Sequence, residues 1–213
     1  MFSILVASAK GGVGKTTIAS NLAGCYATRG KSVTLVDADP QGSARSWCAK
    51  RDVVGAQVSS VDGTRRLWAR HIPADTTHLV IDAPAGAMPK QLDGLINQAH
   101  AMLVPILPSV LDMEATVRFL DALAEVPRVA RGEMAVGLVA NRLKPWTHAS
   151  QQAVEQMRAW PCELVGQLRD TQAYVLLAGL GKCLFDFNSE TIRSHQEDWQ
   201  PLLHWLERVR KRG

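Results

Sequence analysis

The stretch Lys10-Gly11-Gly12-Val13-Gly14-Lys15-Thr16-Thr17 lies between an apolar run of strand length and a run with helical period. Glycines allow a loop to curl so that its backbone amides face a phosphate group, and the start of a helix adds a favourable field. In this pattern Lys15 is expected to reach the β- and γ-phosphates of a nucleotide, and the Thr16 hydroxyl to bind Mg²⁺. A glycine-rich turn without a ligand does not account for so many fixed positions. The stretch therefore predicts a phosphate-binding loop.

Outward from this loop, apolar runs alternate with segments of helical period. The runs are nearly continuous and rich in β-branched residues, as in strands that are buried on both faces of a parallel sheet. They cover residues 3–7, 32–36, 78–81, 101–107 and 134–140. This alternation predicts a doubly wound α/β fold, in which helices flank a mostly parallel sheet on both faces.

Helices are expected in several of the segments between and after these runs. One covers residues 16–28 and ends at Gly30, a second covers 112–123, and a third covers 150–160 and is closed by Pro161. From residue 189 to the end, apolar residues form a stripe beneath a charged face, which predicts a helix docked on the sheet.

Length and composition bound the classes of protein that remain. A chain of 213 residues with 46% hydrophobic and 21% charged residues is typical of one globular domain, here residues 1–213. The longest apolar stretch is interrupted by Pro105 and Pro108, so no membrane span is expected. The start of the chain does not resemble a signal peptide, and the four cysteines form no paired motif. We therefore expect a cytoplasmic protein with reduced thiols and no zinc or iron-sulfur site.

Carboxylates follow two of the predicted strands. Asp37 and Asp39 end the strand that precedes Pro40-Gln41-Gly42, and Asp82 ends the next apolar run. Ligands of such folds bind at the carboxyl ends of parallel strands, so these acids should face the phosphate-binding loop. Asp39 is placed to orient an attacking water, and Asp82 to hold the hydration shell of Mg²⁺. A role for Asp37 and Asp39 as caps of the following helix stays open.

These residues carry a family resemblance. The chain resembles the ParA-type partition ATPases of the deviant Walker A group, within the MinD/ParA superfamily, and especially the small ParF-like proteins. The match extends over nearly the whole chain through KGGVGKTT (10–17), VDADPQG (36–42), VIDAP (80–84), PILPS (105–109) and VANR (139–142).

The resemblance implies roles for matching residues. Lys10 is expected to be the signature lysine, which crosses the interface of an ATP-bound dimer to the partner's phosphates. Asp39 is expected to be required for hydrolysis, and Asp82 to be the Walker B acid, so that Thr16, Asp37, Asp39 and Asp82 surround Mg²⁺. Asn141, with Arg142 beside it, is expected to read the adenine, although Asn141 could also be an ordinary turn residue. The cofactors implied are ATP and Mg²⁺, held by Lys10, Gly11, Gly12, Val13, Gly14, Lys15, Thr16 and Thr17.

The resemblance also implies partners. We expect a homodimer in the ATP state, non-specific binding to double-stranded DNA, and a ParB-like or cargo-adaptor protein that stimulates slow hydrolysis. The protein would then be associated with the nucleoid and would segregate or position a plasmid, a chromosome locus or a protein compartment. The net charge of +4 permits a polyanionic partner. Candidate phosphate contacts are Arg158, Arg169, Lys182 and Arg193.

Two other functions stay open at this point. A MinD-like membrane-cycling ATPase would use the basic C-terminal segment as a reversible anchor, although Pro201 and His204 interrupt its apolar stripe. A metabolic enzyme of the amidotransferase-partner or ligase kind would need a substrate pocket, for which no insertion is evident.

Overall fold

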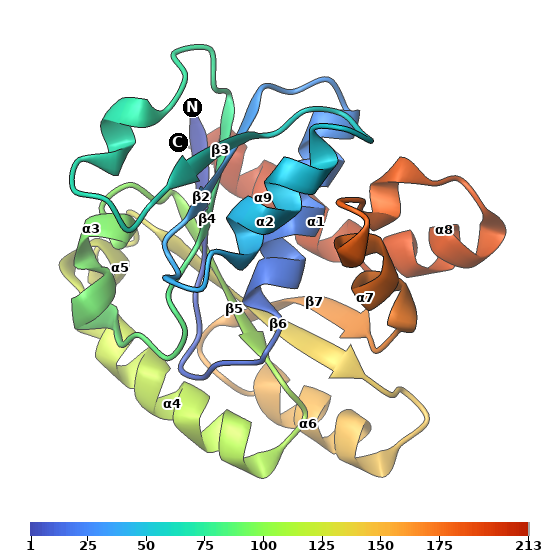
Figure 1. The fold of residues 1–213 in the computed structure, drawn as a ribbon. Coiled ribbons are helices and arrows are strands. Elements are labelled where there is room, and N and C mark those ends of the chain that lie inside the picture. The colour runs from blue at the N-terminus through green and yellow to red at the C-terminus, as the bar shows by residue number, and fades with distance from the viewer. Residues whose placement is uncertain (213) are drawn as a thin grey trace.

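A sheet of seven parallel strands runs through the computed structural model, which describes residues 1–212 (Figure 1). The strand order is β3-β2-β4-β1-β5-β6-β7. The strands are β1 (Phe2–Val6), β2 (Val33–Asp37), β3 (Ser59–Asp62), β4 (His78–Asp82), β5 (Ala101–Ile106), β6 (Ala135–Leu143) and β7 (Glu163–Arg169). The fold class is therefore the predicted one, and every strand pair is parallel.

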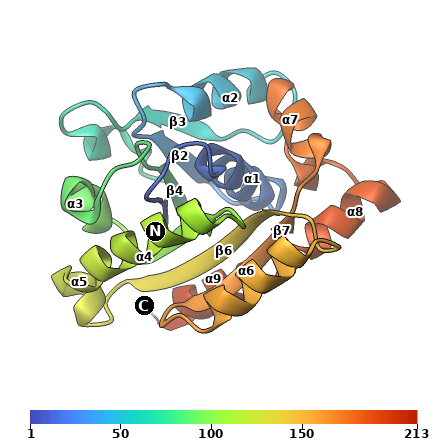
Figure 2. The same ribbon diagram turned by 90° about the horizontal axis from the view of Figure 1, so that it is seen from below.

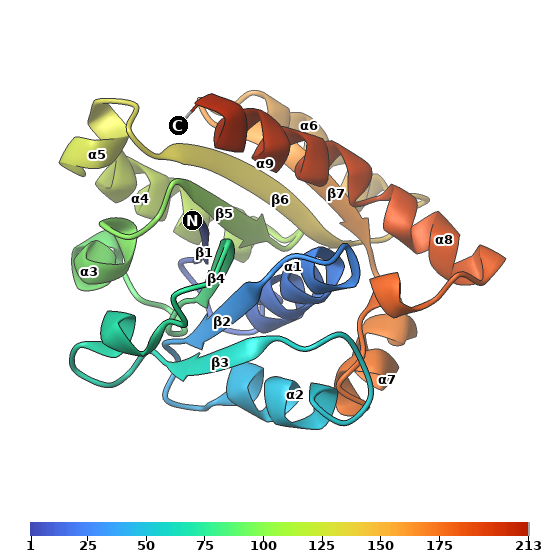
Figure 3. The ribbon, with the colours of Figure 1, turned by 90° about the horizontal axis from the view of Figure 1, so that it is seen from above.

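Helices cover both faces of this sheet (Figures 2 and 3). They are α1 (Lys15–Thr28), α2 (Ser43–Arg51), α3 (Asp93–Ile96), α4 (Val110–Ala124), α5 (Pro127–Ala130), α6 (His148–Arg158), α7 (Gln172–Gly179), α8 (Glu190–Glu197) and α9 (Gln200–Arg212). Short 3₁₀ segments occur at Trp68–His71, Pro89–Leu92 and Leu184–Asp186. The faces are buried in two hydrophobic clusters, one beneath α1, α2 and α9 and the other beneath α3, α4 and α6.

The five strands predicted from apolar runs are present, and their ends agree with the prediction to within three residues. The edge strands β3 and β7 were not predicted. β3 is four residues long and mostly exposed, and β7 has polar residues that interrupt its apolar pattern, so neither forms a continuous apolar run. Helices α2 and α7 were also missed.

The expectation of one helix from residue 189 onward was wrong. The segment is divided at Asp198 and Trp199 into α8 and α9, because the two halves pack on different parts of the molecule. Helix α8 contacts the 3₁₀ segment Leu184–Asp186, whereas α9 covers β7. Trp199 lies fully buried at the joint, where its indole N–H donates to the Tyr174 hydroxyl at 2.9 Å.

The register brings the ends of three central strands to one level. Val6 and Asp37 both pair with Asp82, so β1, β2 and β4 finish side by side. The glycine-rich loop and the strand-end carboxylates therefore share the carboxyl edge of the sheet, which is the lower edge in Figure 1. This is the edge where doubly wound folds bind ligands.

Candidate functional site

The glycine-rich stretch forms a loop between β1 and α1. Gly12 and Gly14 have φ angles of 77° and 95°, in the left-handed region that glycine adopts readily. A Cβ atom on Gly14 would collide with Nδ2 of Asn141, so only glycine fits there. The loop leads directly into the first turn of α1, whose free backbone N–H groups favour an anion.

Asn141 supports this loop from the end of β6. It is 5% exposed, and its amide nitrogen donates to the Val13 carbonyl at 2.7 Å. Arg142 beside it has a φ of 52°, which is uncommon for a residue with a side chain, and its side chain is exposed. Asn141 therefore lies at the phosphate-binding loop, while contact of Asn141 or Arg142 with an adenine base stays a prediction.

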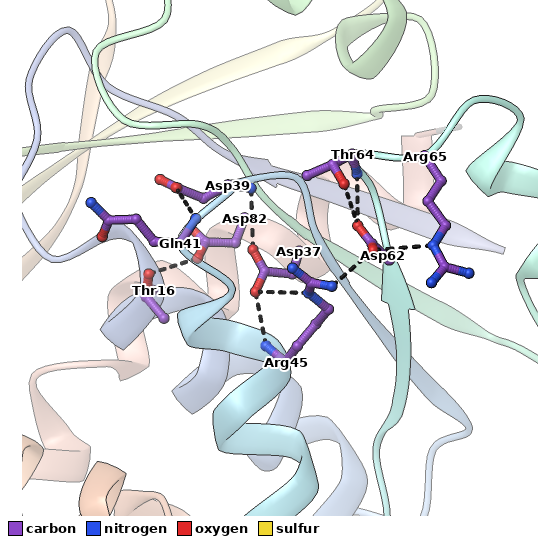
Figure 4. Close-up of polar contacts among 9 residues, drawn as sticks. All are labelled: Thr16, Asp37, Asp39, Gln41, Arg45, Asp62, Thr64, Arg65 and Asp82. Atoms are coloured by element: carbon purple, nitrogen blue, oxygen red, sulfur yellow. Dashed lines mark hydrogen bonds and ion pairs between the residues drawn. The ribbon is translucent and has the colours of Figure 1, made fainter.

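Thr16 and Asp82 are two of the four residues predicted to surround Mg²⁺, and they contact each other. The Thr16 hydroxyl donates to Oδ2 of Asp82 at 2.6 Å, and Oδ1 of Asp82 is buried without a hydrogen-bond partner (Figure 4). Burial raises the pKa of Asp82 to about 7, and the neighbouring Asp37 adds to the increase. A hydroxyl beside an unpartnered carboxylate oxygen is a donor set that suits Mg²⁺, which takes few protein ligands and completes its shell with water and phosphate oxygens.

The Lys15 ammonium interacts electrostatically with Asp82 and Asp39. Its side chain is 6% exposed, and burial lowers the pKa of its ammonium, while the charges of Asp82 and Asp39 act in the opposite direction. A desolvated ammonium at the start of α1 is a strong attractor for phosphate oxygens.

Asp37 is fully buried and holds the start of α2. Its Oδ2 accepts from the backbone N–H of Arg45 at 2.9 Å, and its Oδ1 accepts from that of Asp39 at 3.1 Å. Both oxygens are thus occupied by backbone donors. Asp37 acts as a cap of the following helix in this structure, and its contribution to a metal site stays a prediction.

Asp39 accepts hydrogen bonds in two loops at the carboxyl edge of the sheet. Its Oδ1 accepts from the backbone N–H of Gln41 at 2.9 Å, within the first loop. Its Oδ2 accepts from the backbone N–H of Ala85 at 2.9 Å, in the loop that follows Asp82. A single carboxylate therefore joins the loop after β2 to the loop after β4.

Lys10 lies on the exposed side of the phosphate-binding loop. Its Nζ is 3.9 Å from Oδ2 of Asp112, at the start of α4. Ser109 caps that helix and donates its hydroxyl to the same carboxylate. A pair at this distance and exposure is weak, so Lys10 is free to leave it for a stronger anion.

A charged network that joins α2 to the end of β3 was not predicted from the sequence. Nη1 of Arg45 lies 2.8 Å from Oδ2 of Asp62, at the end of β3, and Arg65 binds the same oxygen at 3.2 Å (Figure 4). The Thr64 hydroxyl donates to Oδ1 of Asp62 at 2.6 Å. Because β3 itself was not predicted, no sequence pattern placed Asp62 near this site.

A buried arginine, also missed, anchors the far end of α2. Arg51 is fully buried, and its guanidinium makes two hydrogen bonds to the Asp186 carboxylate at 2.8 and 2.9 Å. The indole N–H of Trp47 donates to the Lys182 carbonyl at 3.2 Å. Helix α2 begins at the loop after β2, and its far end is therefore bound to the segment after α7.

The four candidate DNA contacts differ in their charge environments. Arg158 and Arg169 line one cavity of about 360 Å³, but Glu155 and Asp198 line it too, and Arg169 Nε lies 2.8 Å from Asp198 Oδ2. Lys182 lies over the Phe187 ring, 5.2 Å from its centre. Arg193 is exposed on α8. The charge of Arg169 is thus already paired, and contact of these residues with DNA stays a prediction.

Comparison with known proteins gives one family and several relatives. The family model described as CobQ/CobB/MinD/ParA nucleotide binding domain matches residues 4–182. The chain is 32% identical over 164 residues to "Maintenance of carboxysome distribution protein A" of Halothiobacillus neapolitanus, covering 73% of this chain and 74% of the relative. It is 29% identical over 188 residues to "Chromosome-partitioning ATPase Soj" of Thermus thermophilus, covering 73% and 75%.

A crystal structure of a plasmid partition protein from Borrelia burgdorferi, bound to AMPPNP, shares the fold. It superposes with a TM-score of 0.75 over 95% of this chain and 98% of the other, at 16% identity. At that identity the likeness concerns the arrangement of the elements alone.

Proposed function

The chain belongs to the CobQ/CobB/MinD/ParA nucleotide-binding domain family, and from this premise we propose that it is an ATP-dependent positioning ATPase. It binds ATP and Mg²⁺, dimerises in the ATP state, and hydrolyses ATP slowly until an adaptor protein stimulates it. The relative from Halothiobacillus neapolitanus is named for carboxysome distribution, which supports a protein compartment as one class of cargo. A plasmid or a chromosome locus is the other class.

The observation that carries the proposal is the position of Asp39. Its carboxylate joins the loop after β2 to the loop after β4 by hydrogen bonds of 2.9 Å on each side. A change at either loop therefore moves the residue that is proposed to orient the attacking water. This couples hydrolysis to the conformation of both loops, as a switch requires.

The remaining residues bind the nucleotide and neutralise its charge. The amides of Gly11 to Thr17 and the Lys15 ammonium hold the phosphates, and Thr16 with Asp82 holds Mg²⁺. The metal supplies charge neutralisation at the phosphates when it is bound. Asn141 keeps the loop in shape through its bond to Val13, so the loop is ordered before the nucleotide arrives.

Lys10 acts between subunits. Two nucleotides that face each other in a dimer concentrate negative charge, and a lysine from each subunit offsets it. The weak pair with Asp112 costs little to break, so ATP in the partner subunit can capture the ammonium. Dimerisation then depends on ATP.

The ATP-bound dimer binds double-stranded DNA without sequence preference, and the protein is therefore cytoplasmic and associated with the nucleoid. Within residues 1–212, none of the helices combines the length and apolar composition needed to cross a bilayer.

A membrane-cycling ATPase is the second candidate, with α9 as its anchor. Four apolar side chains of this helix are at most 6% exposed because they cover the sheet, namely Leu202, Leu203, Trp205 and Leu206. An amphipathic helix binds a membrane through an apolar face that is free to insert. The burial of this face favours DNA over lipid.

Co-sedimentation separates the two candidates. The ATP-loaded protein is mixed with random-sequence duplex DNA or with vesicles of phosphatidylglycerol and phosphatidylcholine, and the ADP-loaded protein serves as the control. We expect ATP-dependent sedimentation with DNA at low salt and none with vesicles. Binding to vesicles alone would favour the membrane-cycling class instead. ATP hydrolysis no faster than that of a Lys15→Ala control would contradict the proposed ATPase activity.

A further inference from the structure

Six of the 24 lysines and arginines of the chain gather at the edge of the sheet opposite to the nucleotide site. The turn between α1 and β2 carries Arg29 and Lys31, and the last turns of α9 carry four more cations. Helix α9 begins after Asp198, which binds Arg169 at the end of β7, and reaches Glu163 at the start of β7 through Arg208 at 2.9 Å. It therefore runs antiparallel to β7 and ends at the amino edge, near the start of β1 at the top of Figure 1. We call the amino-edge patch the set Arg29, Lys31, Arg208, Arg210, Lys211 and Arg212.

The geometry of the turn holds two of these cations in fixed positions. Gly30 has a φ of 73° and follows α1, whose Ala27 carbonyl accepts from the Gly30 N–H at 2.9 Å. The Lys31 N–H bonds to the Tyr26 carbonyl at 3.1 Å, which completes a Schellman motif. Arg29 and Lys31 are exposed on either side of this glycine. Among residues 1–212, neither has a carboxylate within 4.0 Å, so both charges are available to an outside anion.

A cation of the turn and a cation of α9 both influence the pKa of the buried His78. Burial lowers the pKa of His78, and the charges of Lys31 and Arg210 lower it further. These two cations also line one cavity of about 720 Å³, together with His78, His100 and Asp75. The amino edge is thus a hollow with cations from segments that lie far apart in the sequence.

Acidic residues compensate this charge only in part. Glu163 pairs with Arg208, Glu207 pairs with Arg210 at 2.6 Å and with Lys211 at 4.0 Å, and Asp75 lies in the cavity. These three carboxylates stand against the six cations of the patch. The excess is comparable to the net charge of +4 of the whole chain. By contrast, Arg158 and Arg169 share their cavity with an equal number of acids.

We propose that the amino-edge patch is the surface through which this chain contacts the phosphate backbone of duplex DNA. The inference rests on the proposed function and assigns its DNA step to a surface other than that of Arg158, Arg169, Lys182 and Arg193. The cations extend from a turn to a helix end, which suits a polyanion that offers several phosphates. An anionic membrane is disfavoured because the apolar face of α9 is buried.

The position of the patch has a consequence for regulation. It lies at the opposite edge of the sheet from Lys15 and Asp39, so one subunit carries the whole surface without help from the nucleotide. In a dimer whose nucleotide sites face each other, the two patches lie at opposite outer ends, so ATP strengthens binding only to DNA that is long enough to reach both patches. On a duplex too short to reach both patches, the ATP-free monomer and the dimer should bind with the same salt slope.

The test compares two variants that remove the same charge from different surfaces. Arg29→Gln/Lys31→Gln removes two cations from the patch, and Arg158→Gln/Arg193→Gln removes two exposed cations elsewhere. Binding of each ATP-loaded protein to a fluorescent random duplex is measured by anisotropy over a range of salt concentrations. Each phosphate neutralised contributes roughly 0.9 to the slope of log affinity against log salt, so on a short duplex, which reaches one patch, the patch variant should lose about 2 in slope and the control almost none.

Each outcome decides the assignment. Unchanged binding of Arg29→Gln/Lys31→Gln would overturn the patch while leaving the proposed function intact, as would loss of binding in the control variant alone. A parent protein that binds no duplex at low salt would overturn the patch and the DNA step of the proposed function together. ATP hydrolysis and the thermal unfolding midpoint of each variant are measured alongside. Both should match the parent, because none of the four substituted residues lies at the nucleotide site.

Discussion

Oδ2 of Asp39 accepts a hydrogen bond from the backbone N–H of Ala85 at 2.9 Å, across 46 residues of sequence. Asp39 follows β2 and Ala85 follows β4, two neighbouring strands whose last residues pair in register. The bond therefore spans adjacent strand ends at the carboxyl edge. Its energy is that of a charge-assisted hydrogen bond to a partly exposed carboxylate, strong enough to hold the loops and weak enough to exchange.

Asp39→Ala should bind ATP and dimerise but lose hydrolysis, because the proposed partner of the attacking water is removed while the phosphate contacts remain. Loss of such a group lowers turnover by roughly 10² to 10⁴-fold. Phosphate release measures the rate, and calorimetry measures ATP binding. The exposed Asp121→Ala on α4 is the matched control. Turnover at the parent rate would remove Asp39 from its assigned role.

Lys15→Ala should abolish ATP binding. The buried ammonium is the fixed cation of the phosphate-binding loop, and loss of about 3 kcal/mol of charge-assisted bonding lowers affinity by roughly 100-fold or more. Lys50→Ala, an exposed lysine on α2, should bind as the parent does. Near-normal affinity of the Lys15 variant in calorimetry would show that the loop does not bind phosphate in the expected way.

Lys10→Ala should bind ATP as a monomer and fail to form the ATP-dependent dimer, since only the charge directed at the partner's nucleotide is removed. Light scattering with and without ATP measures the mass. Lys90→Ala provides an exposed lysine outside the loop for comparison. A Lys10 variant that still doubles its mass with ATP would refute the role between subunits.

Arg51→Ala should destabilise the fold by about 3 to 5 kcal/mol, because it leaves the Asp186 carboxylate partly buried without its bidentate partner. Urea unfolding measures the loss, with exposed Arg66→Ala as the control. Arg51→Met/Asp186→Leu should recover much of it, because no unpaired charge is left. A single variant as stable as the parent would contradict the anchoring of α2 through this pair.

The parent should lose stability as the pH falls below about 6.5, and His78→Phe should lose less. The pKa of His78 is lowered in the folded protein, chiefly by burial, while the unfolded chain has the ordinary value. The unfolded state therefore takes up a proton first, and acid favours unfolding by at most about 1.4 kcal/mol per pH unit. Phenylalanine keeps the ring that stacks on Tyr26, 4.4 Å away between centroids.

Urea unfolding of both proteins at pH 8 and pH 5.5 measures this difference. The stability gap between parent and variant should shift in favour of His78→Phe at the lower pH. Equal pH dependence in the two proteins would show that His78 takes no part in acid destabilisation.

The sequence by itself determined the features that depend on local order. The glycine-rich loop, the strand-end acid Asp82 and the alternation of strand and helix are patterns within short windows, and each needs only its neighbours along the chain to form. Gly30 was likewise predicted to end α1, because a left-handed residue after a helix is a local requirement.

Only the tertiary structure decided which distant residues meet. Arg51 and Asp186 lie 135 positions apart, and their pairing depends on how α2 packs against the segment after α7. Arg29 and Arg210 share one edge because α9 runs antiparallel to β7, whereas Arg169 is paired with Asp198 at the opposite end of that strand. The sequence gives the number and order of the charged residues but not their neighbours in space. The packing of helices on the sheet decides whether a cation is paired with a carboxylate or exposed to a partner.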